Sequence, residues 1–597
     1  MSTVPERDDI DEQYKWDLSD LFADETAFEQ SVAETEELID ELATYEGRVT
    51  EDPETLADVL DCSERLMRTV SNVATYTRLK TSEDTRNQEY QALSARAESL
   101  TATARSTAGF IDPELQECSA TEIEEMIEAN PALEEYEQYF DDVLRMKPHT
   151  RSTAIEQLLG ELSEVTSAPS EIYKLLTNAD MRFPTVEDPS GDAVEITQAN
   201  FTTLQKTPDR AFRKEVYTSF YDEWETVRNA VGAALKNSVT NDVKQAQAHN
   251  YDTAREAALH PKKIPPAVYD TLVGTVNDNL DTLHQHLELK REVLGVDALR
   301  MWDVYMSLTG NESPEISYEQ ASEYVTAAVS PLGEDYQNQL ADGLESRWVD
   351  VYENAGKQSG AYSSGTYDTQ PYIMMNYQDD ISSLFTLAHE LGHSMHSYYS
   401  NEHQPFVYAN YEIFVAEVAS TVNETLLTHH LLETVEDETL RRHVLDEYLE
   451  RFRSTLLRQT MFAEFEHRVH EIVEGGGALT PDRFDECYGE LKGRYLDPVV
   501  MDDRIAREWM RIPHFYMGYY VYQYATGISA AVAIVEQLLD PDQPDAADRY
   551  LDFLSSGSSD YPLELLREAG VDMASPAPIE TAFETYESYL DRYDSLV

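Results

Sequence analysis

Residues 389–393 read His-Glu-Leu-Gly-His and are the most informative segment of the sequence. Residues 383–399 predict a helix, because leucine and methionine recur at helical spacing along one face. Positions four apart lie one turn from each other on the same side of a helix, so His389 and His393 can direct their rings at one metal ion. Glu390 lies beside the first ring, where its carboxylate can reach a water molecule. This arrangement is typical of a zinc peptidase, although two ordinary helix histidines can also produce it.

A zinc site of this kind needs a third protein ligand and a further position for water. Residues 414–424 predict a second helix, on which Glu417 and Glu424 lie two turns apart on one face. Glu412 stands just before that helix, and the residues alone leave all three glutamates open as the ligand. Ser420 and Glu424 are also candidates to accept the second ring N–H of a metal-binding histidine.

Several separated blocks of the chain share a family pattern. They are residues 360–362 (Gly-Ala-Tyr), 367–372 (Tyr-Asp-Thr-Gln-Pro-Tyr), 385–396 around the histidines, 457–466 and 512–527. In this order they resemble oligoendopeptidase F, in the M3 family of zinc oligopeptidases that also contains thimet oligopeptidase. The resemblance runs from about residue 20 to the end of the chain, and several ordered blocks are far more specific than one five-residue motif.

The resemblance implies a ligand set and a fold. Glu417 matches the family's third ligand, in a context with one extra residue, Ala416, that is typical of the oligoendopeptidase F branch. It implies one Zn²⁺ per chain held by His389, His393 and Glu417, with Glu390 as the general base. It further implies a mainly α-helical, bilobed body with a deep substrate channel and a small β-sheet beside the active-site helix.

The segment 512–527 resembles the family's substrate-contacting region. Peptide hydrolysis develops negative charge on the former carbonyl oxygen, and a second donor beside the metal usually stabilises it. His514 and Tyr522 are the predicted catalytic donors. The neighbouring rings predicted to bind substrate are Tyr519, Tyr520 and Tyr524. Which tyrosine donates stays open from the sequence, because any single one of these rings can simply pack.

Two further positions are predicted to contact substrate. Gly360 lies in a loop of small residues, 356–365, whose backbone freedom suits a wall that yields to a peptide. Residues 371–377, with Tyr372, predict a short edge strand just before the histidine helix. An edge strand can pair with a peptide backbone and so accept many sequences. A plain surface loop and hairpin explains the same composition.

The composition is strongly acidic, with 114 Asp and Glu residues against 45 Lys and Arg residues and a net charge of −69. Only 13 of the basic residues are lysine, so we expect a protein from a salt-accumulating halophile. The acids are spread along the whole chain and 10% of residues are aromatic, which argues against disorder. Such a charge argues against nucleic acid and anionic membrane surfaces as partners, and we expect neither.

The sequence also predicts a compartment and a domain layout. It has no apolar signal core at its start, no apolar run of membrane-spanning length, and three cysteines far apart outside the motifs. We therefore expect a cytoplasmic protein, while the oligomeric state stays unpredicted. The expected domains are an acidic N-terminal arm at 1–20, an N-terminal helical domain at 21–195 and a catalytic domain at 196–597.

The predicted function is hydrolysis of internal peptide bonds in short oligopeptides. A peptidyl-dipeptidase of the same family is one alternative. It would need a cation to hold the terminal carboxylate, and Arg504, Arg507 and Arg511 are available. A peptide-binding protein that does not cleave is the other alternative. The presence of Glu390 argues against it, since a pure binder has no use for a general base.

Overall fold

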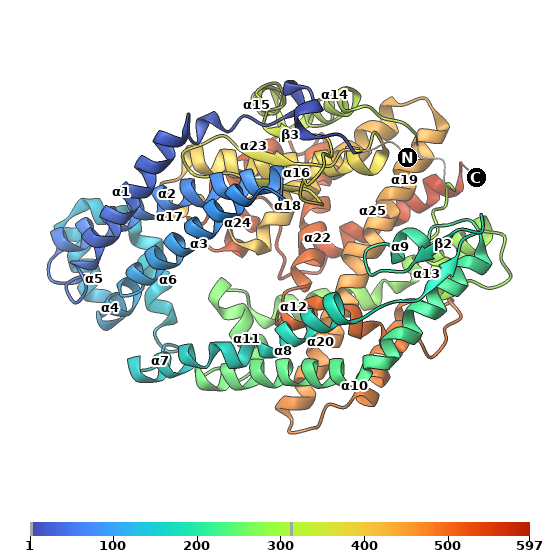
Figure 1. The fold of residues 1–597 in the computed structure, drawn as a ribbon, viewed down its shortest axis with the longest axis horizontal. Helices are drawn as coiled ribbons and strands as arrows, with labels where there is room; N and C mark the ends of the chain where they lie inside the picture. Colours follow the sequence, from blue (N-terminus) through green and yellow to red (C-terminus); the bar gives the residue numbers. More distant parts are fainter. Residues whose placement is uncertain (1–3, 311–313, 597) are drawn as a thin grey trace. The chain divides into compact units, whose positions relative to one another are not determined.

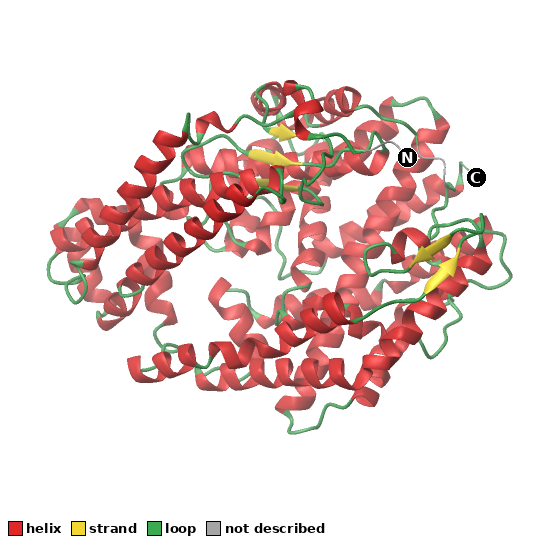
Figure 2. Ribbon diagram, in the orientation of Figure 1, coloured by secondary structure: helices red, strands yellow, loops and turns green. Residues whose placement is uncertain are grey.

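The computed structural model describes residues 4–310 and 314–596 (Figure 1). Helices dominate and the strands are short, which confirms the mainly α-helical prediction (Figure 2). The chain forms two compact units, each assembled from three separate segments. Unit 1 comprises Met1–Pro148, Glu315–Glu433 and Ile534–Gly570, and unit 2 comprises His149–Pro314, Thr434–Ala533 and Val571–Val597. The boundaries expected at residues 20 and 195 and the substrate channel stay predictions.

Three long helices begin unit 1: α1 (Glu25–Ala43), α2 (Pro53–Glu83) and α3 (Gln88–Ala108). Each starts with a side chain that accepts a first-turn N–H, supplied by Asp24, Asp52 and Asn87 in turn. Such caps satisfy donors that a helix leaves unpaired. The three helices pack on one another through their apolar faces, as their sequence periodicity predicts.

Shorter helices complete unit 1, and two of them, α16 and α18, hold the histidines and glutamates of the predicted metal site. The helices are α4 (Ile111–Glu117), α5 (Ala120–Ala129), α6 (Glu137–Met146), α14 (Tyr318–Ala328), α15 (Glu334–Glu345), α16 (Ile381–His403), α17 (Phe406–Ala409), α18 (Ile413–Thr434), α23 (Ala546–Ser555) and α24 (Pro562–Glu568). The apolar stripe of α16 is completely buried at Leu384, Leu387, Leu391 and Met395, as predicted.

A three-stranded sheet contacts α16, with the strand order β3-β5-β4. The central strand β5 (Tyr372–Met374) pairs in parallel with β3 (Val349–Asp350) and antiparallel with β4 (Tyr362–Ser364). The expectation of an edge strand over residues 371–377 is therefore wrong, because β5 is paired on both sides and the edges are β3 and β4. The side chain of Tyr372 is fully buried, which argues against its predicted contact with substrate.

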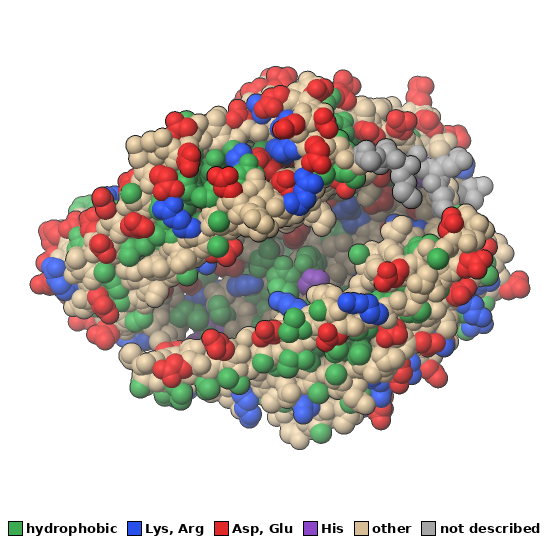
Figure 3. Space-filling model, viewed as in Figure 1, with side chains coloured by type: hydrophobic (Ala, Val, Ile, Leu, Met, Phe, Trp, Pro, Cys, Tyr) green, Lys and Arg blue, Asp and Glu red, His purple; other side chains and the backbone are tan. Residues whose placement is uncertain are grey.

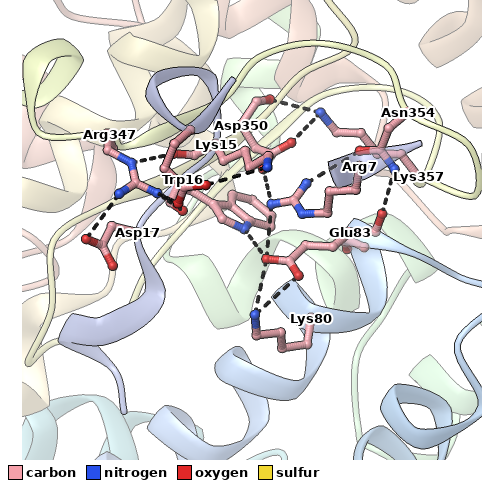
Figure 4. Close-up of polar contacts among 12 residues, drawn as sticks. Arg7, Lys15, Trp16, Asp17, Lys80, Glu83, Arg347, Asp350, Asn354 and Lys357 are labelled. Atoms are coloured by element: carbon pink, nitrogen blue, oxygen red, sulfur yellow. Dashed lines mark hydrogen bonds and ion pairs between the residues drawn. The ribbon is translucent and has the colours of Figure 1, made fainter. Parts of the chain in front are cut away.

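The N-terminal arm is anchored along β3 (Figure 4). Arg7 pairs with Asp350 of β3 at 2.5 Å and with Glu83 of α2 at 3.2 Å. The indole N–H of Trp16 donates to the same Glu83 carboxylate at 2.8 Å. Lys357 contacts Asp350 from the other side at 2.6 Å. These buried contacts join the arm, α2 and the sheet of unit 1.

Unit 2 is arranged around α10 (Arg210–Ala248), a helix of 39 residues that packs against α8, α20 and α21. The other elements of unit 2 are α7 (Thr153–Glu161), α8 (Ser163–Leu175), a β1–β2 hairpin (Thr185–Glu187 and Ala193–Glu195), α9 (Phe201–Leu204), α11 (Ala254–Leu259), α12 (Pro266–Asp278), α13 (Leu280–Val293), α19 (Glu438–Arg451), α20 (Arg458–Glu474), α21 (Pro481–Tyr495) and α25 (Ala577–Asp594). α22 (Tyr522–Leu539) starts in unit 2 and ends in a segment of unit 1.

Acidic side chains are scattered over the visible surface without gathering into a single patch (Figure 3). This distribution agrees with acids spread along the whole sequence. Among the helices in the described part of the chain, none is both long and apolar enough to cross a membrane.

Candidate metal centre

Helices α16 and α18 approach each other closely at Gly392. A Cβ atom added to Gly392 would lie 2.5 Å from the carbonyl oxygen of Ala419 and 2.5 Å from Cα of Ser420. Only hydrogen fits in that space, so glycine lets the two backbones meet. The contact brings the histidines on either side of Gly392 to the first turns of α18.

Three candidate ligand atoms converge there. Nε2 of His389 and Nε2 of His393 are 3.2 Å apart, and Oε2 of Glu417 lies 3.6 and 3.8 Å from them. Tetrahedral zinc with ligands at about 2.0–2.2 Å separates neighbouring ligand atoms by about 3.3–3.6 Å. The triangle therefore fits one face of a zinc tetrahedron. Among the described residues, His389, His393 and Glu417 form a group that could hold a metal ion. Glu412 is not part of this group.

The remaining polar groups of α18 support the candidate ligands. Nδ1 of His389 lies 2.8 Å from Oε1 of the buried Glu424, and Oγ of Ser420 donates to Oε2 of Glu417 at 3.3 Å. A hydrogen bond from Nδ1–H leaves the lone pair of Nε2 directed toward the other ligand atoms. Glu424, one of the alternative ligands in the sequence, thus orients a histidine instead.

Burial and neighbouring charge set the protonation of the group. Burial alone would lower the pKa of His389, but Glu424 and Glu417 outweigh it and raise the pKa to about 9. Burial and the adjacent His389 lower the pKa of His393 to about 3, which favours the neutral ring that a metal requires. Burial also raises the pKa of Glu390 to about 7, against the opposing charge of His389.

Glu390 faces the edge strand of the sheet. Its carboxylate is buried and accepts a backbone hydrogen bond from Ser363 of β4. The hydroxyls of Ser363 and Ser394 share a second hydrogen bond of 2.8 Å, which fastens β4 to α16. Gly360 precedes this strand with a φ of +92°, and an added Cβ would meet no atom within 4 Å. The backbone at Gly360 therefore has open space on the side of an added Cβ.

A polar cavity of about 220 Å³ borders the same helix. Its walls include Thr366 and Tyr367 from the loop after β4, Asn401 from α16, and Tyr411. Tyr411 stacks on the ring of His396 with 3.6 Å between centroids. Neither Ser363 nor Tyr411 was identified from the sequence, because no motif or spacing marks them; the contacts depend on how distant segments fold together.

The predicted substrate-contacting rings belong to unit 2, whereas the metal group belongs to unit 1. The structure groups His514 with Tyr520 and Tyr524. The His514 ring lies parallel to Tyr520 and edge-on to Tyr524, with 6.1 Å between centroids in both pairs. The two tyrosine hydroxyls are 3.4 Å apart. All three side chains are half-buried, so part of each remains accessible.

Tyr519 and Tyr522 lie differently from this trio. The Tyr522 ring is 1% exposed and packs on Tyr269 at 5.2 Å between centroids, and Tyr519 is 3% exposed with its hydroxyl 3.2 Å from His467. Burial argues against the predicted catalytic role of Tyr522 and the predicted substrate contact of Tyr519. Tyr520 lies just before α22 and Tyr524 lies in its first turn, with 5.5 Å between their ring centroids.

Comparison with known proteins agrees with these observations. The profile of peptidase family M3 matches residues 203–585, and that of oligopeptidase F matches residues 114–183. Oligopeptidase PepF of Bacillus subtilis (strain 168) is 41% identical over 595 residues, covering 100% of this chain and 89% of the relative. Group B oligopeptidase PepB of Streptococcus agalactiae is 38% identical over 592 residues, covering 99% of this chain and 98% of the relative.

Solved structures give the same assignment. Oligoendopeptidase-F from Enterococcus faecium has a TM-score of 0.74 and 34% identity, covering 95% of this chain and 98% of that one. A crystal structure from Chlamydophila abortus has a TM-score of 0.90 and 31% identity over 100% of both chains. The likeness in sequence and fold extends over the whole length and includes the segment with the His-His-Glu group. The chain therefore belongs to peptidase family M3, in its oligoendopeptidase F branch, and is a metallo-oligopeptidase that hydrolyses peptides.

Proposed function

We propose that this oligopeptidase is a zinc endopeptidase that cleaves internal bonds of short peptides. The observation that carries the proposal is the triangle of His389, His393 and Glu417 donor atoms, 3.2 to 3.8 Å apart, with Glu390 next to the first ligand. Zinc held by these three residues would supply a Lewis acid for hydrolysis. Two nitrogens and one carboxylate oxygen form a donor set that zinc accepts in catalytic sites.

Glu390 is the proposed proton carrier. Its carboxylate takes a proton from the attacking water, and the resulting carboxylic acid passes that proton to the nitrogen of the leaving amine. The backbone N–H of Ser363 holds this carboxylate in place, so proton transfer starts from a fixed position. Glu424 keeps the His389 ring oriented throughout.

The edge strand β4 is the proposed docking site for the peptide backbone. β4 pairs with β5 on one side only, and an extended peptide can add to the other side. Backbone pairing depends little on side chains, which suits an enzyme that accepts many sequences. The 220 Å³ cavity beside α16 would receive one substrate side chain, and its hydroxyl and amide walls favour a polar one.

His514, Tyr520 and Tyr524 are the proposed donors to the developing oxyanion. Hydroxyl and imidazole N–H groups can stabilise such a charge when they are held in position beforehand. The packing of the three rings on one another supports this role, and their partial exposure leaves them able to contact a peptide. Tyr520 and Tyr524 are thus proposed for the donor role that the sequence predicted for Tyr522.

A specific observation disfavours the peptidyl-dipeptidase alternative. Arg504 pairs with Asp222 at 2.7 Å, and Arg507 pairs with Glu225 at 2.8 Å. Arg511 lies over the rings of Phe201 and Phe220. Two of the three candidate cations are thus paired with carboxylates, and the third lies against aromatic rings of unit 2.

A pair of fluorogenic peptides tests the proposal. Each has about ten residues and an internal quencher; one is blocked at both ends and the other has a free C-terminus. We expect internal cleavage of both, loss of activity after chelation, and recovery on adding one equivalent of zinc. Cleavage of the free-ended peptide alone, two residues from its end, would instead establish a peptidyl-dipeptidase. Zinc and peptide binding without any cleavage would establish a binding protein.

A further inference from the structure

We propose that unit 2 contains a binding site for a monatomic anion of the size of chloride, in a cavity bordered by Arg453, Arg458 and Lys492. The cavity has a volume of about 20 Å³. That is room for one particle of about the size of water. The remaining wall is formed by Tyr305, Tyr495 and apolar side chains, including Leu283, Met301, Leu457 and Met461.

Positive charge is in excess around this cavity. Glu450 pairs with Arg453 at 2.6 Å and with Lys290 at 2.5 Å. Glu508, which is 1% exposed, pairs with Arg458 at 2.9 Å and also with Lys492. Each of the two carboxylates therefore serves two cations, so the two groups together leave a surplus of positive charge.

A fifth cation adds to the surplus. Arg511 is close enough to Glu508 to lower the pKa of that carboxyl, together with Lys492 and Arg458. Its buried Nη1 has no hydrogen-bond partner among the residues that the structure describes. Asp446, near Lys290, and the neighbouring Glu447 are two further carboxylates of the region, and Arg451 and Lys206 lie near Glu447. The cations of the region thus outnumber its carboxylates, and uncompensated buried charge is costly.

The pKa of Tyr305, in the cavity wall, is also affected by this positive charge. Burial raises the pKa of a phenol, yet Arg458, Arg511 and Lys492 outweigh burial and leave the pKa of Tyr305 below its ordinary value. Arg453 also lies over the Tyr305 ring, with 5.6 Å from the guanidinium carbon to the centroid. The surroundings of this ring therefore favour negative charge at the cavity.

Lys492 and Arg458 carry more N–H donors than their hydrogen bonds to Glu508 use. Lys492 uses one N–H on Glu508, and Arg458 uses one N–H on the same carboxylate. An ammonium and a guanidinium each carry several more donors. A halide accepts such N–H groups from several directions and tolerates apolar walls on its other sides. A space of about 20 Å³ holds about one water-sized particle, which fits a monatomic ion better than a carboxylate or sulfate.

Thermal unfolding of the full-length protein tests the proposal. Sodium gluconate is replaced stepwise by sodium chloride or bromide at constant ionic strength, so that screening does not change. A ligand that binds only the folded state raises Tm with its concentration. We expect a saturating rise of at least about 2 °C for the wild type. The rise should be absent in Arg458→Gln and retained in Arg504→Gln, whose arginine pairs with Asp222 away from the cavity wall.

Crystals of the wild type grown in sodium bromide provide a second measurement that does not depend on any variant folding. We expect an anomalous bromide peak within hydrogen-bond distance of Lys492 Nζ or of an Arg458 nitrogen. An ordered water or no density in the cavity would overturn the proposal. So would a Tm that responds equally to gluconate and chloride, or a halide response that Arg458→Gln retains in full.

Discussion

Gly392 of α16 and Ala419 of α18 meet backbone to backbone, with only 2.5 Å between the place of a Cβ on the glycine and the alanine carbonyl oxygen. The ligand candidates lie immediately around this contact: His393 follows Gly392, and Glu417 precedes Ala419 by two residues. The separation of the two helices therefore sets the size of the metal triangle. Glycine at this position is a structural requirement of the site rather than a spacer between the histidines.

Replacing Gly392 by alanine should weaken metal binding sharply. The added methyl group must push α18 away from α16, which enlarges the distances from Glu417 to the histidine nitrogens. We expect purified Gly392→Ala to hold much less than one zinc per chain and to lose most activity. Gly274→Ala is the control, because Gly274 is on the exposed side of α12 with no atom within 4 Å of an added Cβ. It should keep full zinc content and gain up to about 1 kcal/mol of stability. Equal zinc content in both variants would contradict the account.

Glu424→Gln tests the support of His389. The glutamine can still accept a hydrogen bond, but it lacks the charge that raises ligand basicity. Loss of such a partner typically weakens metal affinity by about 10- to 100-fold. Competition with a chelating dye measures this affinity directly. Glu402→Gln, at an exposed position of α16, should leave it unchanged. An unchanged affinity in Glu424→Gln would mean that the 2.8 Å contact has no role in holding the metal.

A buried carboxyl in unit 2 should make stability depend on pH. Glu466 accepts the backbone N–H of Tyr519 at 2.8 Å, and burial raises its pKa from 4.5 to about 8 despite the favourable charge of His470. The folded state therefore binds this proton more tightly than the unfolded state. The contribution of the protonated Glu466 carboxyl to the free energy of unfolding is fully present below about pH 4.5. It is lost as the pH rises through about 8.

Glu466→Gln cannot ionise, so its Tm relative to the wild type should increase as pH rises through that window. Thermal scans at several pH values between 5 and 9, at constant salt, measure the difference. Glu584→Gln removes an exposed carboxyl of α25, also in unit 2, and should show a flat difference. A flat difference for Glu466→Gln as well would contradict the shifted pKa.

The buried pair at β3 should be strongly coupled. Asp350 and Lys357 are 2.6 Å apart, with side chains 3% and 1% exposed. Removing one partner of a buried pair leaves an uncompensated charge and typically costs about 3–5 kcal/mol. Arg7 still contacts Asp350, so we expect Lys357→Met to fall near the lower end of that range.

The double variant Asp350→Asn/Lys357→Met should recover part of this loss, because no unpaired carboxylate remains. Unfolding midpoints of the wild type, both single variants and the double variant give the coupling energy. Strictly additive losses would show that the pair contributes nothing beyond its separate side chains.

The local pattern of α16 was predictable from the sequence. Leucine and methionine at helical spacing gave the buried stripe, and the spacing of His389 and His393 put both rings on one side. The identity of the third ligand was not predictable from the residues alone, because Glu412, Glu417 and Glu424 all fit a helix beside the site. The resemblance to the M3 family supplied that choice, and the triangle agrees with it.

Contacts between distant segments could not be predicted from the sequence, for physical reasons. Which strand of the sheet is the edge depends on the pairing of β5 with β3, far away in sequence, so Tyr372 was mistaken for an edge residue. The direction in which each tyrosine side chain points depends on where α22 begins. Without that start, Tyr522 was preferred over Tyr520 and Tyr524. The halophilic source stays a prediction, because composition alone supports it.

Glu390→Gln, compared with the wild type in the same zinc and peptide assays, tests the proposed mechanism most directly. The substitution keeps the size and hydrogen-bonding capacity of the side chain but removes its ability to take a proton. We predict that the variant binds one zinc per chain, binds peptide, and cleaves the end-blocked peptide at least about 100-fold more slowly, in line with loss of a general base. A variant that holds zinc and cleaves at the wild-type rate would contradict the account.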